Sequence, residues 1–235
     1  MAPLSNRTFK ALSALLSYPT EELCAAIPDI ATAVAAEGLV SDEAGKNLQP
    51  LLADLAALDL YDLQERYCEL FDKTRRHSLH LFEHIHGESR DRGQAMVDLA
   101  EHYRRGGLLV AANELPDFIP LFLEFLSARP FEEARGLLTE TGHIFSLLEE
   151  RLAKRNAGYA AVFTAIRSIA GEPTVAADAA ETDEPDEPDD LAAIDAAWEE
   201  TAVAFGPGNA TDGCSVDRLK IQMRAANRDA RNNMA

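Results

Sequence analysis

The residues best suited to chemistry lie in one stretch, residues 71–93, which carries four of the six histidines of the chain. Within it, His80-Leu81-Phe82-Glu83-His84 matches the pattern H-x-x-E-H. In that pattern two imidazoles one helical turn apart bind zinc and the glutamate acts as a base. A zinc hydrolase is therefore one hypothesis, if residues 79–86 form a helix. The pattern fixes only three positions, and no distinctive downstream motif supplies a third ligand.

A structural role for the same side chains is the alternative that we favour. Glu83 and His84 would then form charge-assisted hydrogen bonds that fix the connection between two helices. The candidate partners are arginines close in sequence: Arg75, Arg76, Arg90 and Arg92. The chain also lacks a P-loop, a G-x-S-x-G elbow and a dinucleotide-binding fingerprint. The sequence thus predicts no catalytic residue, no metal and no cofactor.

A second informative stretch, residues 114–126, places acidic residues before an unusually apolar helix. Asp117 is the predicted N-cap, with Pro120 tolerated in the first turn. Because the helix is apolar nearly all round, it forms either the centre of the core or the floor of an apolar groove. Glu114 and Asp117 beside such a floor suit a groove that holds an apolar helix and binds its basic flank.

Apolar residues at helical spacing predict an all-α fold for residues 1–171. The first helix is expected to stop before Pro19, and Thr20 to cap the second, which Pro28 should kink or divide. Asp59 is the predicted N-cap of a fourth helix. Eight helices are expected, around residues 9–18, 20–34, 48–55, 59–71, 89–106, 117–126, 134–152 and 159–169.

The composition changes after residue 171. Residues 172–190 contain nine acids, three prolines and no base, which predicts a disordered linker that holds half of the net charge of −18. Residues 191–205 have the pattern of one short amphipathic helix, expected to dock on the bundle or a partner because so short a helix is marginal alone. Residues 206–235 are expected to form a flexible tail.

The composition also bears on the class of partner. An acidic chain without basic clusters is a poor match for nucleic acid, and no segment has the length of apolar sequence that a membrane span requires. The N-terminal residues lack a signal-peptide layout, and the three cysteines are far apart and expected to be reduced. These features favour a cytoplasmic protein, expected to be a monomer, that binds another polypeptide.

Three runs of the chain resemble the nitrate reductase assembly chaperones, the delta subunits of the NarJ type within the TorD- and DmsD-like chaperones: YCELFD (67–72), SLHLFEHIHGESRDRGQAM (78–96) and ELPDFIPLFLEFLS (114–127). The resemblance covers most of residues 8–205. It implies a single-domain helical bundle without catalysis. In the wider family Glu, Pro and Asp are followed by His, and here Glu114, Pro116 and Asp117 match while Phe118 replaces the His.

The resemblance implies a function as well. The chain would bind the N-terminal region of the nitrate reductase α subunit and keep the apoenzyme open for molybdenum cofactor and iron–sulfur insertion before membrane attachment. A different molybdoenzyme client is the alternative. The candidate partner-binding residues are Tyr67, Phe71, Phe82, Glu83, His84, Glu114, Pro116, Asp117, Phe118, Leu121 and Phe122.

Overall fold

The computed structural model describes residues 6–85, 91–111, 114–155 and 157–171. These residues form helices and no strand, so the predicted all-α class is confirmed for the described part of the chain. The helices are α1 (Arg7–Leu15), α2 (Glu21–Glu37), α3 (Asp42–Ala57), α4 (Leu60–Phe71), the 3₁₀ turn η1 (Arg75–His77), α5 (Leu81–Ile85), α6 (Asp91–Arg105), α7 (Ile119–Ser127), α8 (Phe131–Lys154) and α9 (Ala160–Ala170).

Local sequence signals set most of the helix ends. The side chains of Thr20 and Asp59 accept hydrogen bonds from the first turns of α2 and α4, as predicted. Gly107 follows α6 with a φ of 86°, a left-handed conformation that favours glycine. The expectation that Pro28 might divide a helix is wrong, because α2 continues through it.

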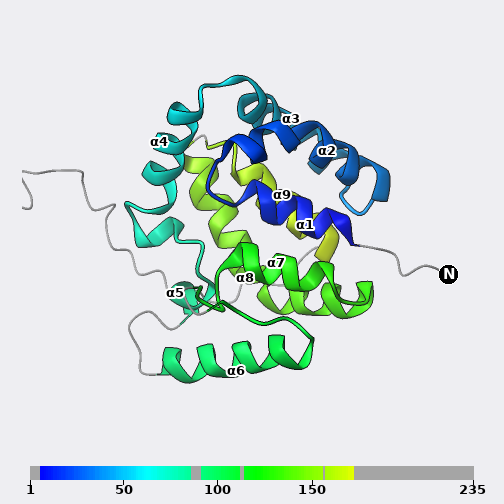
Figure 1. Cartoon of the computed structure of the whole chain (residues 1–235), viewed down its shortest axis with the longest axis vertical. Helices are drawn as coiled ribbons and strands as arrows, with labels where there is room; N and C mark the ends of the chain where they lie inside the picture. Colours follow the sequence, from blue (N-terminus) through cyan, green and yellow to red (C-terminus); the bar gives the residue numbers. More distant parts are fainter. Residues whose placement is uncertain (1–5, 86–90, 112–113, 156, 172–235) are drawn as a thin grey trace, which may run out of the picture. The chain divides into compact units, whose positions relative to one another are not determined.

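The core is built from long-range helix pairs. α8 packs along α9, α9 packs on α3, and α1 lies between α2 and α7 (Figure 1). In the buried interior the Ser13 hydroxyl of α1 donates to the Pro120 carbonyl of α7 over 2.7 Å. The Tyr67 hydroxyl of α4 donates to the Leu16 carbonyl over 2.9 Å, which fixes α4 to the end of α1. Burial raises the pKa of Tyr67, so this donor keeps its proton.

α7 occupies the centre of the core, which was one of its two predicted positions. Seven of its nine residues are buried, and they contact helices on opposite sides: Ile119, Pro120, Leu121, Phe122, Leu123, Phe125 and Leu126. An apolar surface that surrounds a helix must be covered all round, and here α1 and α8 both pack on α7. The helix therefore fixes the position of the chain segment just before it.

α6 lies at the bottom of the described bundle in the view of Figure 1. Tyr103, in its last turn, is fully buried, and its hydroxyl donates to the Pro116 carbonyl over 2.9 Å. The apolar residues Met96, Leu99 and Ala100 in the middle of α6 are only partly buried. The C-terminal end of α6 is thus held more firmly than its middle.

Several predictions fall outside the described residues. The acidic linker at 172–190, the helix at 191–205 and the tail at 206–235 are among them, as are His86, Ser89 and Arg90. Among the described helices, none has the length and apolar character needed to cross a membrane.

Candidate functional site

The two informative stretches of the sequence lie side by side. The Leu81 amide donates to the Asp117 carbonyl over 2.9 Å, and the Ile119 amide donates to the Leu79 carbonyl over 2.8 Å. This antiparallel bridge pairs His80 with Phe118, whose rings lie 5.4 Å apart between centroids. The segment that leads into α5 is therefore fixed against the first residue of α7.

Asp117 is the centre of this arrangement, and it does not cap a helix as predicted. The N-cap position of α7 belongs to Phe118, and no side chain caps that end. The fully buried Asp117 carboxylate instead accepts from His80 Nδ1 over 3.1 Å and from the Phe82 amide over 3.2 Å. It also forms an ion pair with Arg92 of α6 over 3.7 Å. Three segments of the chain thus meet at one carboxylate.

Glu83 is the second acid of the site. Its Oε1 accepts from Arg92 Nη2 over 3.4 Å, which confirms Arg92 as one of the predicted partners. Both side chains are about a quarter exposed, so this ion pair lies at the edge of the site. Arg92 therefore links α6 to α5 through Glu83 and to the start of α7 through Asp117.

His84 is held on the opposite side of α5. Its Nε2 lies 2.8 Å from the Ser78 carbonyl and must carry the proton, and Arg151 of α8 lies 3.5 Å from Nδ1. Arg151 also donates to the Arg76 carbonyl over 2.9 Å. Burial lowers the pKa of His84 and Arg151 lowers it further, whereas the bond to Ser78 raises it. His84 therefore fastens α5 to α8 as a neutral imidazole.

The zinc-hydrolase hypothesis gains no support from this geometry. His80 precedes α5 and bonds to Asp117, Glu83 pairs with Arg92, and His84 bonds to the Ser78 carbonyl. Within the described ranges no group of three His, Cys, Asp or Glu side chains is arranged to hold a metal ion. The structural alternative holds for Glu83, which pairs with Arg92, whereas His84 contacts Ser78 and Arg151, which were not among its predicted partners.

The predicted aromatic groove divides into a buried part and an exposed part. Four of its members are 8% exposed or less and belong to the core: Tyr67, Phe71, Leu121 and Phe122. Phe82 and Phe118 pack against the core but remain partly exposed beside Asp117. Pro116 is partly exposed and Glu114 is exposed. The residues able to touch a partner in this conformation are therefore those around the antiparallel bridge.

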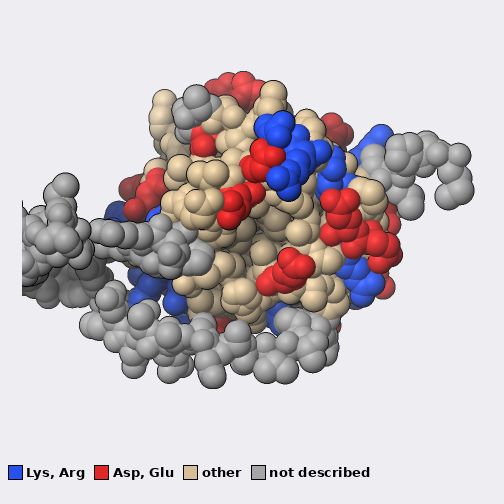
Figure 2. All heavy atoms as spheres, turned by 90° about the horizontal axis from the view of Figure 1, so that it is seen from below, with Lys and Arg blue, Asp and Glu red and all other residues tan. Residues whose placement is uncertain are grey.

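The surface near the bridge also exposes aliphatic side chains. Ile85, Val97, Leu109 and Leu115 are each at least 48% exposed, and they come from α5, α6 and the segment between α6 and α7. Figure 2 shows the molecule from below, the side on which α6 lies in Figure 1, where acidic and basic groups are separated by uncharged areas. Such a surface offers both apolar contacts and acidic partners to a second molecule.

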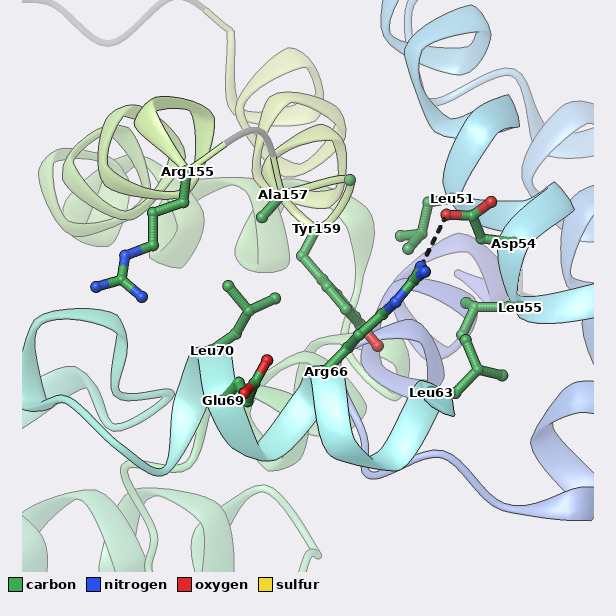
Figure 3. Close-up of a pocket in the computed structure, with 11 residues that line it drawn as sticks. Leu51, Asp54, Leu55, Leu63, Arg66, Glu69, Leu70, Arg155, Ala157 and Tyr159 are labelled. Carbon is green, nitrogen blue, oxygen red and sulfur yellow. Dashed lines mark ion pairs between the residues drawn. The ribbon is translucent and has the colours of Figure 1, made fainter. Parts of the chain in front are cut away.

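A separate pocket of about 370 Å³ opens between α3, α4 and the turn that joins α8 to α9 (Figure 3). Leu51, Leu55, Leu63, Leu70 and Tyr159 give it an apolar lining, and Arg66 reaches across to Asp54 over 3.6 Å. Arg155 stands at the opposite side from Asp54 in Figure 3.

Two of the predicted groove residues lie behind this pocket. The rings of Tyr67 and Phe71 lie 6.1 and 5.1 Å from that of Tyr159, edge to face. Burial raises the pKa of Tyr159 to about 12. Arg151, in the last turn of α8, contacts His84 near the bridge. Arg155, four residues later at the end of α8, lines the pocket. Sequence periodicity missed the pocket, because it predicts inward faces but not whether they fill the space between helices.

Comparison with known proteins identifies the family. The family model described as nitrate reductase delta subunit matches residues 37–165, more than half of the chain. The chain belongs to the nitrate reductase delta subunit family. The matched residues of this delta subunit family member include α3 to α8, and therefore the antiparallel bridge and most of the pocket lining.

Named relatives of this delta subunit family member are similar along most of their length. The nitrate reductase molybdenum cofactor assembly chaperone NarJ of Escherichia coli (strain K12) is 40% identical over 91% of this chain and 89% of its own. NarW of the same strain is 39% identical over 94% and 92%. A solved structure of a candidate redox enzyme maturation protein from Archaeoglobus fulgidus is 26% identical over 68% of this chain and 89% of its own, with a TM-score of 0.47.

Proposed function

We propose that this chain is an assembly chaperone of a respiratory nitrate reductase. It binds the N-terminal region of the α subunit in the cytoplasm and keeps the apoenzyme competent for molybdenum cofactor and iron–sulfur insertion before membrane attachment. Membership of the delta subunit family and the E. coli relative named as a chaperone of this kind support the proposal. The chain acts by binding and has no catalytic residue of its own.

The observation that carries the proposal is that two partly exposed aromatic rings lie at the antiparallel bridge with one buried and one partly exposed acid. Phe82 and Phe118 are partly exposed, and Asp117 and Glu83 lie directly beside them. An amphipathic helix is recognised through apolar anchors, and a basic residue next to the anchors adds selectivity and speed of association. The bridge therefore suits a short client helix with a basic flank.

The candidate residues then have different tasks. Phe82, Glu83, Glu114, Pro116 and Phe118 contact the client directly, because they are exposed or partly exposed. Five of the remaining candidates position these contacts from within: Tyr67, Phe71, His84, Leu121 and Phe122. Asp117 is fully buried in the free chain, where its carboxylate pairs with Arg92. The affinity follows from the small number of anchors. Three or four apolar side chains contribute roughly 5 to 12 kcal/mol, and association costs about 4 kcal/mol or more, which leaves binding near or weaker than micromolar.

Calorimetry tests this proposal with the full-length protein and a synthetic peptide of the α-subunit N-terminal region. Phe118→Ala should weaken binding by about 2 kcal/mol, because one large anchor loses its contact area. Tyr61→Ala is the matched control, since Tyr61 is 80% exposed on α4 and lies outside the site. Absence of heat with the unmodified protein, or equal effects of the two variants, would contradict the proposal.

The identity of the client has its own test. Affinity purification of the full-length chain from its host should recover the nitrate reductase α subunit when cofactor synthesis is blocked, because the unfilled apoenzyme is the form that needs binding. Recovery of a different molybdoenzyme subunit instead would keep the chaperone class and replace the client.

A further inference from the structure

α6 is attached to the bundle by different chemistry at its two ends. At the C-terminal end, Tyr103 is fully buried and Gly106 lies directly under the Phe125 ring, so close that a Cβ would overlap it. Arg129 stacks on Phe125 from 5.0 Å and donates to the Gly106 carbonyl. This end is held by close apolar packing with hydrogen bonds in support.

In the described part of the chain, the N-terminal end of α6 is held by the ionic contacts of Arg92. Arg92 reaches Glu83 over 3.4 Å and Asp117 over 3.7 Å. Both distances exceed the 2.7–2.9 Å of a strong charge-assisted bond, and Arg92 remains 26% exposed. Gly93 follows Arg92, and a methyl group added to its Cα would have no neighbouring atom within 4 Å. A weak ionic contact therefore closes this end of α6.

The middle of α6 adds little to this attachment. Val97 is 62% exposed, and Met96, Leu99 and Ala100 are only partly buried. Helix stability in a folded protein comes mainly from the packing of an apolar face, and this face is incompletely covered. The first turns of α6 can thus separate from α5 at a smaller free-energy cost than its last turn.

We propose that Arg92 is a built-in competitor that occupies the acidic site of the free chaperone. This inference rests on the proposed function and concerns the same site. The guanidinium group of Arg92 lies on Glu83 and Asp117, the two acids beside Phe82 and Phe118. A Lys or Arg of the client helix takes over these acids, Arg92 leaves, and the first turns of α6 move away from α5. The chaperone's own side chain therefore screens the acids until a client of matching charge arrives.

With such competition, the apparent affinity for the client equals the intrinsic affinity multiplied by the fraction of molecules in which Arg92 has left Glu83 and Asp117. A partly exposed ion pair is worth up to about 1 kcal/mol, so removal of Arg92 should tighten binding about two- to fivefold. The gain should disappear when the client peptide carries no positive charge, because that peptide does not compete for Glu83 and Asp117.

The test uses the full-length protein with Arg92→Gln, and calorimetry with two peptides of the α-subunit N-terminal region. One peptide has the natural sequence, and the other has every Lys and Arg replaced by Gln. Arg104→Gln is the matched control, because Arg104 lies on α6 but pairs with Glu101 of the same helix. Arg92→Gln should bind the natural peptide two- to fivefold more tightly, with the control and the neutral peptide unchanged.

Hydrogen exchange supplies an independent readout. Binding of the natural peptide to the unmodified protein should speed amide exchange in residues 95–99 of α6 and leave residues 102–105 protected by the Tyr103 anchor. Arg92→Gln should show the faster exchange before any peptide is added.

The outcomes separate this inference from the proposed function. If the unmodified protein binds the peptide but Arg92→Gln binds equally or more weakly than Arg104→Gln, the competitor is refuted and the chaperone function stands. If the unmodified protein binds no peptide, both the competitor role of Arg92 and the proposed chaperone function are refuted. Unaltered exchange of residues 95–99 on peptide binding also overturns the movement of α6.

Discussion

Replacement of Asp117 by alanine should destabilise the fold far more than a typical surface mutation. The change removes the acceptor of three groups, the Phe82 amide, His80 Nδ1 and Arg92. A buried amide that loses a charged acceptor costs about 1.5–3 kcal/mol. The other two partners are about a quarter exposed and contribute roughly 0.5–1 kcal/mol each.

Part of this loss is recovered, because the carboxylate no longer has to be kept in a buried position. We therefore expect about 3 kcal/mol for Asp117→Ala, a large share of the roughly 5–15 kcal/mol that stabilises an ordinary domain. Asp117→Asn should cost less, about 1–2 kcal/mol, since its amide oxygen still accepts one hydrogen bond while the charge and the second acceptor are lost.

Urea unfolding followed by circular dichroism measures these free energies. Glu114→Ala is the matched control, because Glu114 is an exposed acid three residues away and should change stability by no more than about 0.5 kcal/mol. If Asp117→Ala unfolds at the same urea concentration as Glu114→Ala, then Asp117 does not hold α5, α6 and α7 together and the description of the site is wrong.

Two further predictions concern α5 and the glycines. His84 has a pKa below its unfolded value of about 6.5, so the unfolded chain binds more protons and stability should fall as the pH drops below about 6.5. His84→Gln should lose less stability between pH 7.5 and 5.5 than the unmodified protein or a variant of the exposed His143, and an equal loss would contradict this. Gly106→Ala forces a methyl group into the Phe125 ring and should lower the free energy of unfolding by about 1–3 kcal/mol, as measured in urea. Gly136 lies within α8 with open space around it, so Gly136→Ala should raise the free energy of unfolding by roughly 0.5–1 kcal/mol. Equal midpoints for the two glycine variants would contradict this.

The helices were predictable because their signals are local. Thr20 and Asp59 cap helices where the sequence indicates, and Gly107 after α6 has the left-handed conformation that favours glycine. Hydrophobic spacing and capping residues act within one or two turns, so a single sequence contains them. For α7 the sequence left two positions open, the centre of the core or the floor of a groove, and the packing of α1 and α8 on it places it in the core.

The role of Asp117 was not predictable from its neighbours. An Asp just before a proline-containing first turn has the pattern of an N-cap, but the bridge between His80 and Phe118 directs its carboxylate to α5. That bridge joins two residues 38 positions apart in the sequence. A tertiary contact overrides the local preference, and only a fold can reveal it.

The sequence also could not predict which of the candidate aromatic residues are buried and which are partly exposed. Tyr67 and Phe82 have the same residue class and similar helical context, yet Tyr67 is buried by neighbours from other helices and Phe82 is partly exposed. Periodicity indicates which face turns inward. Whether that face meets a close-packed neighbour or an opening depends on how the helices cross.

The bond between Ser13 and Pro120 has a consequence for synthesis on the ribosome. α1 is made first, but one of its two main partners, α7, is made more than one hundred residues later. Until that stretch has emerged, α1, with its buried side chains Phe9, Leu12 and Leu15, lacks the helix α7 that packs on it. The apolar face of α1 is therefore exposed to aggregation during translation until α7 has been made.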